Sequence, residues 1–195
     1  MKLYYAPGAC SLADHIALIE NGLTFELEKV DLRTRTTASG EDFTKVNPKG
    51  YVPALELDDG TILTENIAVL SYITALGGAT PASGIRHWRV LEALAFVSTE
   101  IHKNFKPFFA PGATDGDRAK ARDILSKRFA WLDEELSHRP FVVDGAVSAA
   151  DYYLFVMLLW ANKVGVAVPS RLGSYLKRLE RLPSFHKALV AEGLA

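Results

Sequence analysis

Cys10 is the only cysteine in this chain of 195 residues, and its position suggests chemistry through a thiolate. It follows a short aromatic run and the Pro7-Gly8 turn, and a helix-like segment begins directly after it. Backbone N–H groups and the helix dipole at such a point stabilise a thiolate and lower the pKa of the thiol. A lone cysteine can equally be a buried and inert hydrophobe. The residues alone leave both interpretations open.

Two other stretches carry groups that could hold a ligand. In KGYVPAL, residues 49–55, Pro53 lies where a strand should begin. A cis Val52–Pro53 bond would turn the backbone N–H and C=O of Val52 outward for an extended peptide, although most such bonds are trans. In LTENIAVL, residues 63–70, Glu65 opens a helix. It could receive a ligand's ammonium group, or it could simply complement the positive end of the helix.

The second half of the chain offers fewer chemical groups. His102 and Lys103 lie on a long helix-like segment, where a lone histidine is more often structural than functional. Ser148 and Asp151 have the spacing of a capping box before an apolar helix, which indicates a role in folding. We find no spacing of His, Cys, Asp and Glu that suits zinc, no P-loop and no G-x-S-x-G motif. We therefore expect no metal site.

The composition is that of an ordinary globular protein. Apolar residues make up 49% of the chain and charged residues 23%, which is enough for a hydrophobic core. The net charge is −1, so we expect neither nucleic acid nor a membrane surface as a partner. The longest apolar run, residues 152–161, is too short to span a bilayer, and Pro7 and Gly8 interrupt any signal peptide. With a single cysteine, which is compatible with a reducing compartment, we expect a cytoplasmic protein.

The elements that must position these residues fall into two halves. Over residues 1–77, alternating strand-like and helix-like runs predict the order βαβ, α, ββα, with a hairpin at Asp59-Gly60. A βαβ unit implies a parallel pair with a right-handed crossover, and the hairpin adds antiparallel strands. The result is a mixed sheet of four strands with helices packed on it. Residues 78–84 are typical of a linker. The helix-like segments 85–105, 117–136, 148–162 and 171–182 predict an all-helical domain over residues 85–195.

Together these motifs resemble those of the glutathione transferases, and most closely the bacterial beta class. The resemblance is carried by MKLYYAPGACSL, VDLRTRTTASGEDF, NPKGYVPAL, LTENIAVLSYI, EIHK, the capping box and PSFHKALVAEGL. It implies a thioredoxin-like glutathione-binding domain, followed by a helical domain that contributes the electrophile site and dimer contacts. It also implies a homodimer that uses glutathione as co-substrate and no further cofactor.

The resemblance implies roles for residues of the first domain. Cys10 faces the glutathione sulfur and can form a mixed disulfide with it. A cis Pro53 lets Val52 pair with the cysteinyl backbone of glutathione. Glu65 and Asn66 hold the γ-glutamyl end.

Further roles follow from the same resemblance. Arg35 lies near the glycine carboxylate, where the class commonly has lysine and where arginine can bind bidentately. In the helical domain, His102 and Lys103 approach the sulfur, and Thr99 and Glu100 lie beside them in the same glutathione-contacting stretch. Cys10 and His102 are therefore the expected catalytic residues.

One position departs from the class. Members often carry asparagine where this chain has Ala95, and that asparagine reaches glutathione across the dimer interface. Alanine cannot hydrogen-bond through its side chain. We therefore expect a lower affinity for glutathione, or a different hold on its γ-glutamyl end.

The expected reaction is attack by the glutathione thiolate on an electrophilic carbon of an apolar co-substrate. The protein would bind glutathione and favour its thiolate, with the co-substrate between the domains, where pockets often form. Candidate lining residues are Phe105, Phe108, Phe109 and Trp160. Two alternatives stay open. One is reduction of disulfides or peroxides through a Cys10 mixed disulfide, and the other is a binding protein for apolar ligands with little turnover.

Overall fold

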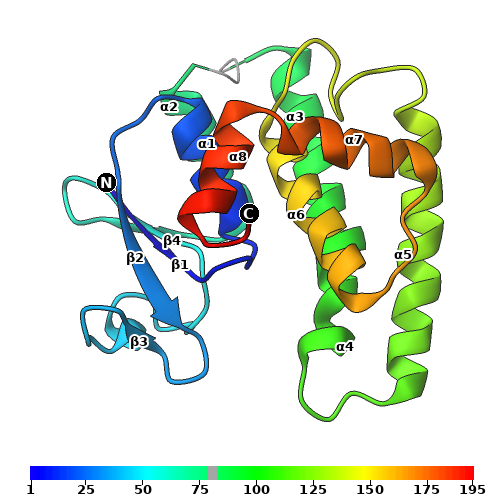
Figure 1. The fold of residues 1–195 in the computed structure, drawn as a ribbon. Coiled ribbons are helices and arrows are strands. Elements are labelled where there is room, and N and C mark those ends of the chain that lie inside the picture. The colour runs from blue at the N-terminus through cyan, green and yellow to red at the C-terminus, as the bar shows by residue number, and fades with distance from the viewer. Residues whose placement is uncertain (79–82) are drawn as a thin grey trace. The chain divides into compact units, whose positions relative to one another are not determined.

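The computed structural model describes residues 1–78 and 83–195, which form two compact units (Figure 1). The first unit comprises Met1–Ala82 and Leu182–Ala195, and the second comprises Ser83–Arg181. The predicted boundaries instead place all of residues 85–195 in the helical domain. The difference arises because the last helix packs against the first helix of the chain. Residues 79–82 of the predicted linker lie outside the described residues.

The first unit is built on a mixed sheet of five strands in the order β3-β2-β1-β4-β5. The strands are β1 (Lys2–Tyr5), β2 (Glu26–Asp31), β3 (Thr36–Thr37), β4 (Ala54–Glu56) and β5 (Ile62–Thr64). Strand β1 lies parallel to β2 and antiparallel to β4, so that Leu3 is opposite both Leu27 and Leu55. The prediction of four strands is wrong, because it omits the edge strand β3. With only two residues, that strand is too short to show an alternating pattern.

Among the described residues, the α-helices of this unit are α1 (Leu12–Glu20), α2 (Asn66–Leu76) and α8 (Pro183–Ala191). Helix α1 is buried from Leu12 to Leu18, and it packs against both α2 and α8. Figure 1 shows the first and last helices side by side, although they come from opposite ends of the chain. Helix α8 therefore helps to hold the turn that precedes α1.

The second unit is all-helical, as the sequence predicts. Its α-helices are α3 (Ile85–Phe96), α4 (Lys106–Phe109), α5 (Asp115–Glu135), α6 (Ala149–Val164) and α7 (Ser170–Glu180). The capping box is confirmed at the start of α6, where the N–H of Ser148 donates to Asp151 at 2.8 Å. A second capping box, from Thr114 and Asp117, starts α5 two residues before the predicted position.

The long helix predicted over residues 85–105 is not continuous. After α3 the chain forms one π-helical turn at Val97–Ile101 and then a 3₁₀ turn at His102–Phe105. Such changes of pitch are frequent at functional sites. They reorient the four candidate residues between Thr99 and Lys103 relative to a straight helix. Among the described residues, no helix is long and apolar enough to cross a membrane.

Candidate functional site

Cys10 lies in the turn between β1 and α1. Ser11 is the N-cap of α1, and its hydroxyl accepts a hydrogen bond from the N–H of Ala6 at 3.3 Å, which closes the turn. The Cys10 thiol is almost buried and donates to the carbonyl of Val52 at 3.4 Å. The Val52–Pro53 bond is cis, as the resemblance implies. The fold thus brings Cys10 and the backbone of Val52 into contact.

The Cys10 thiol is a weaker acid than an ordinary cysteine. Burial, with a smaller contribution from the negative charge of Asp14, raises its pKa from 9.0 to about 12. Backbone N–H groups of Cys10 and Ser11 act in the opposite direction but are outweighed. The lowered pKa predicted from the helix N-terminus is therefore wrong, because desolvation of the thiolate exceeds its stabilisation by backbone dipoles.

Asp14 is a neighbour of Cys10 that the sequence analysis missed. It lies four residues after the cysteine and is fully buried, and neither carboxyl oxygen has a hydrogen-bond partner among the described residues. Burial raises the pKa of this carboxyl well above its ordinary value, because desolvation disfavours the charged form. The signal in the sequence is a spacing of four, one turn of a helix, between a thiol and an acid.

Glu192, after the end of α8, ties down the turn that carries Cys10. One carboxylate oxygen accepts a hydrogen bond from the N–H of Gly8 at 2.9 Å, and the other lies 3.0 Å from Nδ1 of His15. The side chains of His15 and Glu192 are 2% and 0% exposed. Sequence reasoning missed this bridge because Glu192 lies 184 residues from Gly8.

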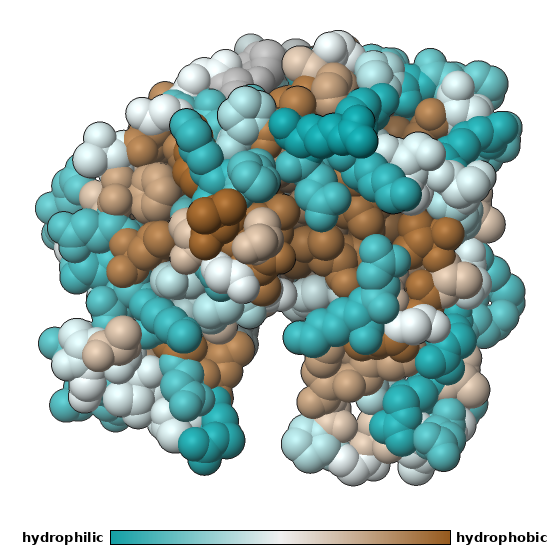
Figure 2. Space-filling view, viewed as in Figure 1, coloured by the Kyte–Doolittle hydropathy of each residue, from teal (hydrophilic) through white to brown (hydrophobic). Residues whose placement is uncertain are grey.

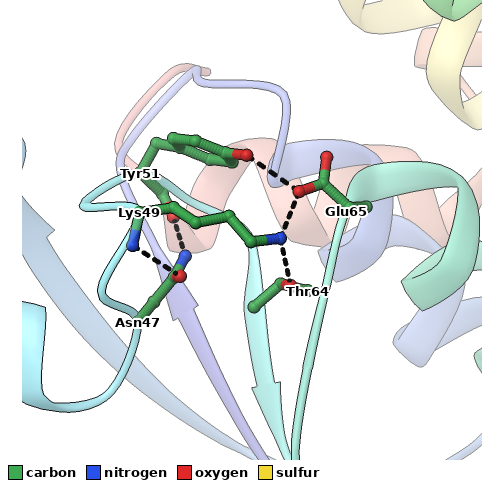
Figure 3. A network of polar contacts seen from close by, with 5 residues as sticks. All are labelled: Asn47, Lys49, Tyr51, Thr64 and Glu65. Atoms are coloured by element: carbon green, nitrogen blue, oxygen red, sulfur yellow. Dashed lines mark hydrogen bonds and ion pairs between the residues drawn. The ribbon is translucent and has the colours of Figure 1, made fainter.

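Glu65 lies in a polar network at the start of α2 (Figure 3). Its carboxylate accepts a hydrogen bond from the Tyr51 hydroxyl at 2.8 Å and forms an ion pair with Lys49, whose ammonium also donates to Thr64 at 2.8 Å. The hydrogen bond from Lys49, followed by that from Tyr51, lowers the pKa of Glu65. The carboxylate is half exposed. The backbone of Glu65 is left-handed, with a φ of 74°. An anion held in this way is available to a cationic ligand group.

Asn66 and Arg35 belong to the same unit. Asn66 is 8% exposed, and neither atom of its side-chain amide has a hydrogen-bond partner among the described residues. An unpartnered buried amide is costly, so this group is suited to bind a ligand. The guanidinium of Arg35 lies against Gly50, where an added Cβ would be 3.1 Å from Nε. The positive charge of Arg35 thus lies next to the segment that carries Lys49 and Tyr51.

The candidates of the helical unit differ in their surroundings. His102 is partly buried, and its Nδ1 contacts the hydroxyl of Tyr153. Burial lowers the pKa of His102 to about 4, so the imidazole is neutral near pH 7. Glu100 is already paired, since Arg128 donates to it from Nε at 3.0 Å and from Nη2 at 2.6 Å. Thr99 donates to the carbonyl of Ala95 at 3.0 Å, and Lys103 is exposed.

The four aromatic candidates form one cluster around Trp160. The ring centroids of Phe105 and Phe109 lie 5.6 Å and 4.9 Å from the Trp160 ring, and Phe108 lies 6.1 Å from Phe105. The His102 ring is 5.0 Å from Trp160. Phe105 is fully buried and Phe109 is 46% exposed, so the cluster reaches from the core to the surface of this unit.

The predicted site residues therefore form two groups, one in each unit. In the first unit, Cys10 contacts Val52 beside the cis proline, while Glu65 and Asn66 follow each other at the start of α2. In the second unit, His102 joins the aromatic cluster. Within the described residues, no group of three or more His, Cys, Asp or Glu side chains could hold a metal ion.

The first unit, in which a cis proline lies next to a cysteine at the start of a helix, has a thioredoxin-like topology. The unit that follows it in the chain is all-helical. Residues 9–76 match the family described as "Glutathione S-transferase, N-terminal domain", and residues 89–187 match "Glutathione S-transferase, C-terminal domain". The chain belongs to the glutathione S-transferase family.

Individual relatives agree with this assignment. The chain is 38% identical to "Glutathione S-transferase GstA" of Escherichia coli O157:H7, over the full length of both chains. Among solved structures, it is similar to a sphingomonad glutathione S-transferase complexed with glutathione, with a TM-score of 0.94 and 48% identity. It is also similar to a bacterial beta class enzyme from Sphingomonas chungbukensis, with a TM-score of 0.95 and 44% identity. Both comparisons cover all of each chain.

Proposed function

We propose that this protein conjugates glutathione to electrophilic, apolar compounds. The observation that carries the proposal is the full-length similarity to glutathione S-transferases, one of them solved with glutathione, together with a cis Val52–Pro53 bond beside Cys10. Val52 would pair its backbone with the cysteinyl residue of glutathione, which brings the sulfur of glutathione close to Cys10.

The ends of glutathione would be held by charge complementarity in the first unit. The Glu65 carboxylate would bind the γ-glutamyl ammonium group, and the unpartnered amide of Asn66 would bind its carboxylate. Arg35 would bind the glycine carboxylate. Hydrogen bonds between charged groups are among the stronger polar contacts in proteins. Because Lys49 already pairs with Glu65, glutathione must displace or share that contact.

Residues of the second unit would complete the binding of glutathione. Thr99 would offer a hydroxyl group and Lys103 an ammonium group. Glu100 would contact glutathione and keep its ion pair with Arg128. His102 is neutral near pH 7 because burial lowers its pKa to about 4. A neutral imidazole can accept a hydrogen bond from the glutathione thiol and so orient it, while a pKa of about 4 makes His102 too weak a base to keep the proton.

In the proposed reaction, the glutathione S–H releases its proton to water and the thiolate attacks the electrophilic carbon. A new S–C bond forms, and the electron pair of the broken bond leaves with the leaving group or moves onto an adjacent atom of an unsaturated co-substrate. Cys10 would assist as a neutral thiol that donates a hydrogen bond to the glutathione sulfur. The covalent alternative gains no support, since the raised pKa of Cys10 disfavours its thiolate.

The apolar co-substrate would bind at the aromatic cluster around Trp160. Aromatic side chains supply large apolar surface with defined edge-to-face geometry, and Phe109 keeps part of the cluster accessible. His102 lies against the same ring. This arrangement suits planar, aromatic electrophiles.

We further propose a cytoplasmic homodimer that assembles through the helical unit. Helices α3 and α5 carry exposed apolar side chains, with Ile85 72%, Trp88 62% and Trp131 49% exposed. Ile85 and Trp131 line one pocket of this unit, and a continuous exposed apolar surface is typical of association sites. Ala95 lies on α3, so a partner subunit would meet alanine where the class often has asparagine.

A panel assay tests the proposal. The protein is incubated with glutathione and either an aryl halide, an unsaturated carbonyl or an epoxide, and parallel reactions contain a disulfide or a peroxide. We expect saturable conjugation above the uncatalysed rate, retained in Cys10→Ala, with little disulfide or peroxide reduction. Reduction that disappears in Cys10→Ala would instead support the covalent alternative. Tight binding of apolar dyes without any turnover would support a binding protein.

A further inference from the structure

A pocket lined by arginines lies in the helical unit, among residues to which the proposed transferase site gives no role. It has a volume of about 350 Å³ between the end of α5 and helix α7. Its polar lining consists of Arg139, Arg171, Arg178, Ser170, Ser174 and Tyr175, with one leucine. Among the described residues, no acidic side chain belongs to this lining, although carboxylates next to the pocket pair with Arg139 and Arg171. The space-filling view shows hydrophilic side chains gathered over α7 (Figure 2).

Arg178 is held in place at this pocket by two aromatic rings. Its guanidinium lies 5.5 Å from the ring of Phe141 and 5.6 Å from that of Tyr175, and it donates to the carbonyl of Pro140. The Tyr175 ring is itself fixed, because its hydroxyl donates to the buried Asp151 at 2.7 Å. Within the described residues, Arg178 has no carboxylate at ion-pair distance. A guanidinium held by two ring contacts and a carbonyl is ordered before any ligand binds, and its charge is left for an anion.

The two other arginines are only loosely engaged. Arg139 pairs with Glu135 at 2.8 Å, and Arg171 pairs with Glu134 at 3.2 Å and with Asp133 at 3.7 Å. Arg171 and Glu134 are both exposed, so their ion pair contributes little free energy and the Arg171 guanidinium can turn to a ligand, whereas the Arg139 side chain is 26% exposed. The Nε of Arg139 is buried and has no hydrogen-bond partner among the described residues. Three cationic side chains thus line one volume.

Two hydroxyls extend the donor set. Ser170 begins α7 and is exposed, and Ser174 follows one turn later, where it donates to the carbonyl of Ser170 at 3.0 Å. Both hydroxyls can rotate to donate to an anion. Planar guanidinium groups with nearby hydroxyls match the oxygens of a tetrahedral oxyanion better than they match a hydrophobic ligand.

We propose that this pocket binds the phosphate group of a small phosphorylated compound. Arg178 is the fixed anchor, Arg139 and Arg171 close on the phosphate from the rim, and the serines complete its hydrogen bonds. The proposal does not depend on the glutathione site, since none of these residues is assigned to it. A phosphorylated lipid headgroup offers the same chemistry, and the experiment separates the two sources.

Isothermal titration of the full chain with pyrophosphate and with ADP, at constant ionic strength set by chloride, tests the proposal. We expect saturable binding that weakens about tenfold or more in Arg178→Gln, since a bidentate charged contact is lost. Lys177→Gln removes the same charge from an exposed neighbour on α7 that does not line the pocket, and it should bind as the parent does. Arg171→Gln serves as a second variant with little packing to lose, in case Arg178→Gln unfolds.

The outcomes are distinct. Loss of binding in Arg178→Gln or Arg171→Gln but not in Lys177→Gln supports the site. Cosedimentation with phosphoinositide vesicles that is lost in the same variants, without binding of pyrophosphate, would assign the phosphate to a lipid headgroup. Equal binding by all variants, or no saturable binding of either soluble ligand or vesicles, would overturn the proposal. Glutathione conjugation is measured in each variant and should be unchanged, which separates this result from the transferase function.

Discussion

The Cys10 thiol is expected to be poorly reactive near neutral pH. Burial raises its pKa from 9.0 to about 12, so the neutral thiol persists across the range in which an ordinary cysteine ionises. A difference of this size lowers the thiolate fraction near pH 7 by about a thousandfold. Because the thiolate is the reactive form, oxidised glutathione should give little mixed disulfide under these conditions.

Alkylation kinetics measure this property. The rate of reaction with iodoacetamide should rise about tenfold per pH unit and show no plateau up to about pH 11, because the thiolate fraction keeps growing below the pKa. Burial lowers access at every pH, but only the pKa sets the position of the plateau. A plateau near pH 9.0, the ordinary pKa from which the shift is reckoned, would refute the reasoning.

Substitution of Asp14 tests the cause of the raised pKa. The Asp14 carboxylate adds to the effect of burial on Cys10, so Asp14→Asn should move the alkylation profile to lower pH. Asp59→Asn provides a matched control, since Asp59 lies in the exposed β4–β5 hairpin and caps it through the N–H of Thr61. An equal shift in both variants would contradict a specific contribution from Asp14.

Four further outcomes are expected. Glu65→Ala should weaken glutathione binding by about 1–3 kcal/mol, the usual cost of losing a hydrogen bond to a charged group; calorimetry measures it, and an affinity equal to that of the exposed control Glu20→Ala would reject the role. Asp151→Ala should lower the free energy of unfolding by about 3 kcal/mol, because buried donors lose their acceptor; urea denaturation showing a loss under about 1 kcal/mol would contradict this. Burial lowers the pKa of His102 to about 4, so the pH profiles of kcat/KM for the parent protein and for His102→Gln should have the same shape near pH 6.5. An ionisation near pH 6.5 that is present in the parent and lost in the variant would contradict this. Sedimentation velocity should give a dimer at micromolar concentration, and a monomer would count against the proposed association surface.

Local patterns in the sequence are sufficient for much of the fold. The capping box at Ser148 and Asp151 and the Asp59-Gly60 hairpin depend on residues close together in the chain, and both form as predicted. Strand β3 and the π turn after α3 do not have such signals. Strand β3 is too short to show an alternating pattern of apolar residues. The π turn keeps the apolar spacing of a helix, and only its backbone hydrogen bonds differ.

The surroundings of the candidate site depend on long-range packing that no local pattern contains. The resemblance to a family correctly implies the cis bond before Pro53, yet the contact of Glu192 with Gly8 joins opposite ends of the chain. Nothing in the residue type or sequence position of Glu192 or Gly8 indicates that they are in contact. Their pairing follows only from the way in which α8 packs on α1, which a sequence without an alignment does not reveal.

The acidity of Cys10 shows why position along the chain is not enough to set reactivity. A helix N-terminus stabilises an anion by about 0.3–1 kcal/mol, and by about 2 kcal/mol when it is partly buried. Raising a pKa from 9.0 to about 12 corresponds to about 4 kcal/mol against the thiolate. Both effects act on the same sulfur, and the larger one depends on burial, which the sequence does not specify. A thiol kept neutral in this way can still donate a hydrogen bond, so Cys10 suits the stabilisation of a second sulfur, that of glutathione, better than attack by its own.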